Sequence, residues 1–312
     1  MSDVLSQEKL LQLAAAMREH WDSRIANDYR LWMSDGVESD AQMWETGARD
    51  LEQLLSGLDL TTTRNWYAAE LGCGVGRLLR AAATRVRGVI GLDVATHALS
   101  YAGHFLSGYD NVQLLQTEGT TLEPVEDGSL DLLYSFAVLG NLPVAVFAAY
   151  LREFNRVLRN GGLIRLQLYV GNEQPTVEND TLAIRCYERE RLLRAFQLCG
   201  FDGLSLVDLI MPFDAADPIR GIFPVVLSAV KVSELVPSVE QTLEVLCSEV
   251  EPAAPADWPG SELEYQMSIA RAQQLITKGE LAAGQRVLEF AIKRFAAASP
   301  SAIAVLEELK RS

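Results

Sequence analysis

Cysteine and histidine are scarce in this sequence, whose 312 residues include four cysteines and three histidines. The cysteines form no C-x-x-C pair and lie far apart, at Cys73, Cys186, Cys199 and Cys247. This spacing argues against a disulfide framework and against a zinc site. No carboxylate–asparagine cluster suggests a magnesium site, so we expect the protein to bind no metal. Scattered, unpaired cysteines are typical of a reducing compartment, and we therefore expect a cytoplasmic protein.

The sequence also lacks an excess of basic residues and any long apolar run. Its 27 lysines and arginines are outnumbered by 42 aspartates and glutamates, which gives a formal net charge of −15. A surface this acidic repels a phosphate backbone, so we expect no nucleic-acid partner. No run of about eighteen apolar residues could span a membrane, and residues 1–21 have the pattern of an amphipathic helix rather than a signal peptide. We therefore expect no membrane partner.

Hydrophobic periodicity divides the chain into three predicted parts. Residues 1–58 carry apolar side chains at helical spacing and form a predicted helical N-terminal part. This part includes an aromatic-rich stretch with Trp21, Tyr29, Trp32 and Trp44. Residues 59–233 alternate short apolar runs with helical patterns, and residues 234–312 form a predicted helical C-terminal extension.

The middle part has the pattern of an α/β domain. Its predicted strands are residues 66–71, 88–93, 112–117, 130–136, 163–170, 204–210 and 224–232. Its predicted helices are residues 77–85, 95–107, 144–158 and 187–199. This alternation predicts a doubly wound, mostly parallel seven-stranded sheet that is covered on both faces. Because only a short loop joins the last two strands, we expect an antiparallel hairpin at the edge of the sheet.

The C-terminal extension begins where the strand patterns stop. Residues 251–260 are rich in proline and alanine and have the composition of a linker, and residues 261–312 predict a helical hairpin with its turn at 278–280. Small residues at Ala272, Gly284 and Ala291 would let the two helices approach closely, a spacing that resembles a single tetratricopeptide-type hairpin. One such unit cannot bury its own apolar face, so it must dock on the rest of the chain or on a second copy, as a homodimer. A peptide-binding groove is the alternative.

A glycine-rich segment carries the main functional signal. A predicted buried strand ends at Glu70, and glycines alternate at positions 72, 74 and 76 before a predicted helix. Glycine accepts positive φ and lets a ligand approach the backbone without meeting a Cβ atom. The dinucleotide fingerprint also begins G-x-G, but its spacing is G-x-G-x-x-G rather than G-x-G-x-G. An acidic side chain directly before the loop suits a ligand with an ammonium group better than a pyrophosphate.

Asp93, at the end of the next predicted strand, is the second signal. A carboxylate at this point can accept hydrogen bonds from both hydroxyls of a ribose. Alternatively, Asp93 is the N-cap of the following helix, a position for which aspartate is well suited. The presence of the glycine loop after the preceding strand favours ribose binding.

The segment ELGCGVGRLLRAAA…VIGLDVATHALSYA resembles the cofactor-binding half of class I methyltransferases, which use S-adenosylmethionine. Residues 125–143 are similar to the family's fourth-strand region and residues 151–169 to its fifth. The resemblance covers about residues 60–232 and implies a Rossmann-like fold, S-adenosylmethionine as cofactor, and a small-molecule acceptor that is methylated on oxygen or nitrogen. It also implies that residues 1–58 cover the active site.

The same resemblance implies a set of cofactor-binding residues. Glu70 would lie near the methionine ammonium, and Asp93 would hold the ribose with Val94 on the adenine. The remaining implied contacts are Gly72, Cys73, Gly74 and Gly76 along the methionine and ribose, Glu118 and Gly119 beside the adenine, and Ser135 and Phe136 near the sulfonium. Glu118 has an alternative interpretation as an ordinary exposed carboxylate in a loop.

The sequence departs from the family where a proton acceptor is often found. Many relatives have a histidine before the Leu-Pro that follows strand four, and this chain has Asn141 there. A general base is needed only if the acceptor arrives protonated. His20, Tyr29 and Tyr169 are weak candidates for a catalytic role, and Arg24 is a weak candidate for binding the cofactor carboxylate.

Two other classes of function remain open at the level of sequence. The chain could be a catalytically degenerate methyltransferase-fold protein that binds or assembles through its C-terminal helices, which the missing histidine favours. It could also be a nicotinamide-dependent oxidoreductase of similar topology. The intact glycines and Asp93 argue against the first alternative, and the glycine spacing with Glu70 argues against the second.

Overall fold

A computed structural model of the chain describes residues 7–34, 39–171, 181–209, 222–247, 262–294 and 300–311. Seven strands form one sheet: β1 (Tyr67–Leu71), β2 (Gly88–Asp93), β3 (Val112–Gln116), β4 (Leu130–Ser135), β5 (Leu158–Gly171), β6 (Phe201–Asp208) and β7 (Ile222–Lys231). The strand order is β3-β2-β1-β4-β5-β7-β6. No helix in these ranges is long and apolar enough to cross a membrane.

The sheet confirms the predicted fold class. The five strands β1 to β5 run parallel, whereas β7 is antiparallel to both β5 and β6. The last two strands therefore form the predicted antiparallel hairpin, with β6 at the edge of the sheet. Because parallel strands end on the same side, the loops after β1, β2, β3 and β4 meet at one edge.

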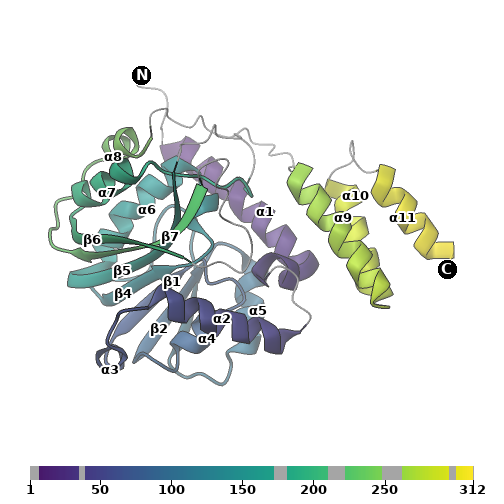
Figure 1. Cartoon of the computed structure of the whole chain (residues 1–312), viewed down its shortest axis with the longest axis horizontal. Helices are drawn as coiled ribbons and strands as arrows, with labels where there is room; N and C mark the ends of the chain where they lie inside the picture. Colours follow the sequence, from purple (N-terminus) through teal and green to yellow (C-terminus); the bar gives the residue numbers. More distant parts are fainter. Residues whose placement is uncertain are drawn as a thin grey trace.

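Helices cover both faces of the sheet, as Figure 1 shows. One face packs against α6 (Val144–Val157), α7 (Arg189–Leu198), α8 (Val239–Leu246) and the first half of α1 (Gln7–Ser34). The other face packs against α2 (Asp40–Leu54), α4 (Leu79–Ala82) and α5 (Thr96–Phe105). The one-turn helices α3 (Leu60–Thr63) and η1 (Leu139–Asn141) lie in connections. Neighbouring residues of β1 serve opposite cores, since Ala69 and Leu71 belong to the first and Ala68 to the second.

The N-terminal part contains two long helices. Helix α2 begins at an N-cap in which the Ser39 side chain accepts the Gln42 N–H at 3.2 Å. It packs on α4, and its Gly47 lies so close to the glycine loop that a Cβ atom would fall 2.2 Å from the Arg77 carbonyl oxygen. Helix α1 packs on α5 and α6 and has a kink at Asp28.

The C-terminal part forms a separate apolar core. Helices α9 (Glu262–Thr277), α10 (Leu281–Arg294) and α11 (Pro300–Arg311) pack together, so the unit has three helices rather than the two expected. A Cβ atom on Gly284 would meet Ile276 Cγ1 at 2.7 Å, which is the close helix approach that the small residues indicated. The unit lies beside α1 (Figure 1) and contacts it through α10 and through Arg271 of α9. The likeness of this unit to a tetratricopeptide hairpin stays a prediction. The homodimer also stays a prediction.

The predicted boundary at residue 233 falls before α8. This helix packs against α6 and α7, and Leu243, Leu246 and Cys247 are part of the main core. Residues 234–247 thus share the core of the sheet domain rather than that of the C-terminal helices. The predicted linker at 251–260 lies outside the described residues.

Candidate functional site

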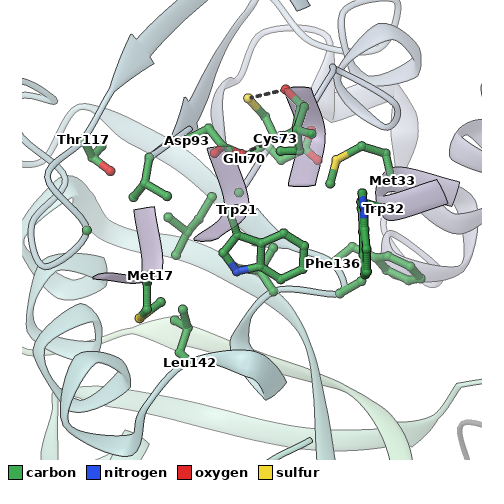
Figure 2. A pocket seen from close by; sticks show the side chains of 18 of the residues that line it. Met17, Trp21, Trp32, Met33, Glu70, Cys73, Asp93, Thr117, Phe136 and Leu142 are labelled. Carbon is green, nitrogen blue, oxygen red and sulfur yellow. Dashed lines mark hydrogen bonds between the residues drawn. The ribbon is translucent and has the colours of Figure 1, made fainter. Parts of the chain in front are cut away.

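A cavity opens at the carboxyl edge of the sheet, where the loops after β1, β2, β3 and β4 meet. The space between its lining atoms is about 970 Å³, including the solvent at its mouth. Figure 2 shows Glu70, Asp93 and Cys73 on its sheet side and Trp21, Trp32 and Met33 from α1 opposite them. The cavity therefore lies between the edge of the sheet and the N-terminal helix.

The glycine loop that follows β1 has a conformation that requires glycine. Gly72, Gly74 and Gly76 have φ values of 72°, 54° and 88°. A Cβ atom on Gly72 would lie 2.3 Å from Val138, and one on Gly74 would lie 2.4 Å from the Met33 sulfur. Gly72 and Gly74 line the cavity, whereas the space beside Gly76 is occupied by Leu106 of the helical layer. Gly76 thus serves close packing behind the loop.

Asp93 ties the glycine loop to the end of β2. Its Oδ2 accepts the Gly74 N–H at 2.8 Å, and its Oδ1 accepts the Ala95 N–H at 2.9 Å. Asp93 is not the N-cap of α5, because that position is Ala95. A carboxylate can accept about four hydrogen bonds, so Asp93 keeps acceptor capacity, and its side chain lines the cavity. Burial raises the pKa of Asp93, and the backbone hydrogen bonds partly oppose that shift.

Glu70 places a second carboxylate in the same cavity wall. It is 2% exposed, and its Oε2 accepts the hydroxyl of Tyr134, on the neighbouring strand β4, at 3.0 Å. Burial raises the pKa of Glu70 to about 8, although the Tyr134 hydrogen bond and the charge of Arg77 act to lower it. The buried Glu70 side chain is therefore protonated at neutral pH. A cationic ligand beside it would favour the ionised carboxylate.

The opposite wall comes from α1 and is mostly apolar. Ala14, Met17, Trp21 and Ile25 precede the kink, and Trp32 and Met33 follow it. The Trp32 Nε1–H is buried and has no hydrogen-bond partner within the part of the chain that the structure describes. An indole donor of this kind in a cavity wall is a candidate for a polar contact with a ligand.

Arg77, Ala137 and Tyr150 are among the contributors to the site that sequence reasoning missed. Arg77 lines the cavity and forms an ion pair with Asp50 of α2, with side chains that are 12% and 8% exposed. Ala137, after β4, has a φ of 58°, and its N–H is held by the Gln167 side chain at 3.0 Å. Tyr150 of α6 also lines the cavity. The partners of Arg77 and Ala137 lie far away in the sequence, so local patterns do not reveal these contacts. A positive φ at a residue other than glycine often marks a functional site, but it is visible only in the structure.

The predicted cofactor residues fall into two groups. The cavity is lined by Glu70, Gly72, Cys73, Gly74, Asp93, Val94, Gly119 and Phe136. Gly76, Glu118 and Ser135 are not in the lining. Glu118 is exposed and accepts a hydrogen bond from Thr120, and the Ser135 hydroxyl donates to the Leu71 carbonyl at 2.9 Å. For these two residues the observed contacts are structural.

The weak catalytic candidates lie outside the cavity lining. The Tyr29 hydroxyl donates to Asp40 at 2.8 Å, and its ring packs on Tyr101. His20 and Tyr169 are buried elsewhere. Arg24 is buried, and its Cζ atom lies 4.9 Å from the centroid of the Trp21 ring. A catalytic or binding role for these residues stays a prediction.

Comparison with known proteins gives one family match and several similar structures. Residues 69–166 match the family model described as a methyltransferase domain. No curated protein matches the chain. Among solved structures, phosphoethanolamine N-methyltransferase 2 of Haemonchus contortus, in complex with phosphomonomethylethanolamine and S-adenosylhomocysteine, is 15% identical with a TM-score of 0.53, and the match covers 70% of this chain and 61% of that one.

Two further solved structures match the chain. Phosphoethanolamine N-methyltransferase 1 of the same organism, in complex with phosphoethanolamine and S-adenosylhomocysteine, is 16% identical with a TM-score of 0.52, and the match covers 75% of this chain and 52% of that one. The YcgJ protein of Bacillus subtilis is 17% identical with a TM-score of 0.47, over 58% of this chain and 99% of that one. The chain thus spans only half to three fifths of the Haemonchus enzymes.

The family match lies on the glycine loop, Asp93 and strands β1 to β5, that is, on the part of the domain that forms the cavity. Residues 69–166 thus match a methyltransferase domain, and the Haemonchus structures share the fold of the chain. This match supports the predicted family, and the sheet confirms the predicted fold class. The methyl acceptor is a separate question.

Proposed function

We propose that the protein transfers a methyl group from S-adenosylmethionine to an oxygen or nitrogen atom of a small molecule bound beneath α1. The observation that carries this proposal is that Glu70 and Asp93 line one cavity together with the glycine loop. Two carboxylates at the ends of neighbouring strands suit a ligand with an ammonium group and two vicinal hydroxyls. A pyrophosphate would meet two negative charges there.

The residues present fit this cofactor. Glu70 would hold the ammonium group, Asp93 would hold the ribose hydroxyls, and Gly72 and Gly74 would allow close approach of the backbone. S-adenosylmethionine supplies an activated methyl group when bound, so the protein has chiefly to position the acceptor and exclude water. Trp21 and the other apolar side chains of α1 would provide the water-excluding wall.

The acceptor side of the cavity supports a small, partly apolar molecule. Met17, Trp21, Ile25 and Leu142 offer apolar surface on this side, and aromatic rings favour aromatic or cationic groups. Histidine is missing from the cavity lining that the structure describes. We propose that acceptor positioning, rather than proton abstraction by an imidazole, carries most of the catalysis.

The test combines binding with turnover. Calorimetric titration of the full chain should show one site for S-adenosylhomocysteine and none for nicotinamide dinucleotides. Incubation with methyl-labelled S-adenosylmethionine and a panel of small phenols, amines and carboxylic acids should then show label transfer by mass spectrometry. Tight binding without transfer to any acceptor would support the degenerate binding protein, and binding of a nicotinamide dinucleotide alone would contradict the proposal.

A further inference from the structure

Helix α1 is interrupted at Asp28, where the backbone leaves the helical region with φ −154° and ψ 91°. The Asp28 carboxylate restarts the helix, because its Oδ1 accepts the backbone N–H groups of the residues two and three positions further on, at 3.1 and 3.2 Å. The segment after the kink, residues 29–34, brings Trp32 and Met33 into the cavity wall. Asp28 therefore sets the direction in which this wall segment leaves the long helix.

The other oxygen of the same carboxylate is bound by the C-terminal helices. Arg271 on α9 donates from Nε to Asp28 Oδ2 at 2.8 Å, and the two side chains are only 5% and 12% exposed. Arg271 also donates from Nη1 to Gln274 Oε1 at 2.8 Å, which orients the guanidinium on its own helix. One carboxylate thus joins the restart of α1 to a unit that is 243 positions away along the chain.

The wall segment is anchored to the sheet domain on its opposite side. Arg30 and Tyr29 both donate to Asp40 Oδ1 at 2.8 Å, at the first turn of α2. The Tyr29 ring lies 4.6 Å from that of Tyr101 on α5, measured between centroids. The segment is therefore held between the catalytic domain and the C-terminal unit, and Met33 reaches across the cavity to Gly74.

We propose that Asp28 and Arg271 form a positioning pair through which the three C-terminal helices hold the cavity wall formed by residues 29–34. A buried ion pair depends strongly on both partners, because removal of one leaves the other charge without compensation. Loss of Arg271 should free the wall segment on one side and loosen Trp32 and Met33. The consequence for cofactor affinity rests on the proposed function, whereas the consequence for the segment itself does not.

The experiment uses the full chain and two readouts. Hydrogen exchange of peptides that cover residues 29–34 is measured without ligand, and calorimetry measures the affinity for S-adenosylhomocysteine. Arg271→Ala should speed exchange in the segment and weaken binding about tenfold, which corresponds to a coupling of about 1.4 kcal/mol. Arg271→Lys keeps one charged donor and should restore part of both effects. Arg286→Ala, an exposed arginine on α10, is the matched control and should change neither.

Each outcome decides the proposal. Equal exchange in Arg271→Ala and in the wild-type chain would overturn it. Faster exchange in the variant, with no ligand binding by any form, would support the positioning pair and contradict the proposed function. If Arg271→Ala unfolds the C-terminal helices, Asp28→Asn replaces it, because asparagine keeps the helix cap but loses the charge. Unchanged exchange in Asp28→Asn would then overturn the proposal.

Discussion

The Asp93 carboxylate accepts the Gly74 N–H at 2.8 Å, so an acid at the end of β2 fixes the glycine loop that follows β1. Its second oxygen accepts the Ala95 N–H at 2.9 Å. Both oxygens therefore face N–H donors. An amide nitrogen in place of either oxygen would set donor against donor, so asparagine is not a neutral replacement at this position.

Asp93→Ala should reduce the affinity for S-adenosylhomocysteine and also the stability of the ligand-free protein. Loss of two charge-assisted hydrogen bonds to a ribose should weaken binding by about 2–4 kcal/mol, or roughly thirty- to a thousand-fold. Asp93→Asn should also weaken binding, because its amide nitrogen would face the N–H of Gly74 or of Ala95 and push the glycine loop or the end of β2 out of place. Calorimetry and thermal unfolding measure the two effects.

Asp59 provides the matched control for Asp93. It is an exposed N-cap that accepts the Thr61 N–H at 2.9 Å, far from the cavity. Asp59→Ala should lower the melting temperature slightly and leave ligand affinity unchanged. If Asp93→Ala behaves in the same way, with lower stability and full affinity, then Asp93 has a structural role and does not hold the ribose.

Gly74→Ala and Gly57→Ala separate backbone strain from obstruction of the cavity. Both glycines have positive φ, 54° and 81°, so each substitution should cost about 1–2 kcal/mol of stability. A Cβ atom on Gly74 points at the Met33 sulfur, whereas one on Gly57 meets nothing within 4 Å. Only Gly74→Ala should therefore weaken binding of S-adenosylhomocysteine. Equal affinities of the two variants in calorimetry would show that the ligand does not approach Gly74.

Local patterns predicted the sheet and most of the cavity floor. The apolar runs located all seven strands, and the order glycine loop, Asp93, then β4 determines which side chains meet at the carboxyl edge. Glu118 shows the limit of this reasoning. It lies one residue beyond Thr117, which lines the cavity, and the chain turns its side chain to the surface. Hydrophobic periodicity cannot predict which of two neighbouring loop residues faces the cavity.

The remaining features of the site depend on contacts between distant segments. Asp50 and Arg77 are 27 positions apart, and Asp28 and Arg271 are 243 apart. Charged residues at helical spacing usually lie on solvated faces, so nothing in the sequence marks these four as buried partners. The kink at Asp28 could not be predicted from the sequence either, because neither proline nor glycine occurs there.

Glu70→Gln tests the buried acid by the pH dependence of binding. Since burial raises the pKa of Glu70 to about 8, a ligand ammonium should bind with release of a proton below that pH. The affinity for S-adenosylhomocysteine should therefore rise between pH 6 and pH 8, by at most about tenfold per unit. Glu70→Gln should bind weakly and remove this dependence. A flat profile in the wild-type chain would contradict an ammonium contact with Glu70.

The same pKa shift has a consequence for stability. Between its ordinary pKa of 4.5 and about 8, Glu70 keeps its proton in the folded state and loses it in the unfolded state. The unfolded state therefore binds fewer protons, and the free energy of unfolding falls as the pH rises through this window. At pH 8 the ligand-free Glu70→Gln variant should be more stable than wild type by roughly 2–4 kcal/mol. Denaturant unfolding at pH 5 and pH 8 measures the difference, with the exposed Glu126→Gln as control.

The buried pair Arg77–Asp50 should matter far more than a nearby exposed pair. Asp50→Ala leaves the Arg77 guanidinium, 12% exposed, without its carboxylate beside the glycine loop, and should cost about 3–5 kcal/mol of stability. Arg85 and Glu52 also join α2 to the region of α4, but the Glu52 side chain is 65% exposed. Glu52→Ala should therefore cost less than about 1 kcal/mol. Denaturant unfolding of both variants tests the contrast, and similar losses would show that water screens Arg77.

A double variant, Asp50→Leu with Arg77→Met, should recover much of the stability lost in Asp50→Ala, because it removes the uncompensated charge and keeps apolar volume.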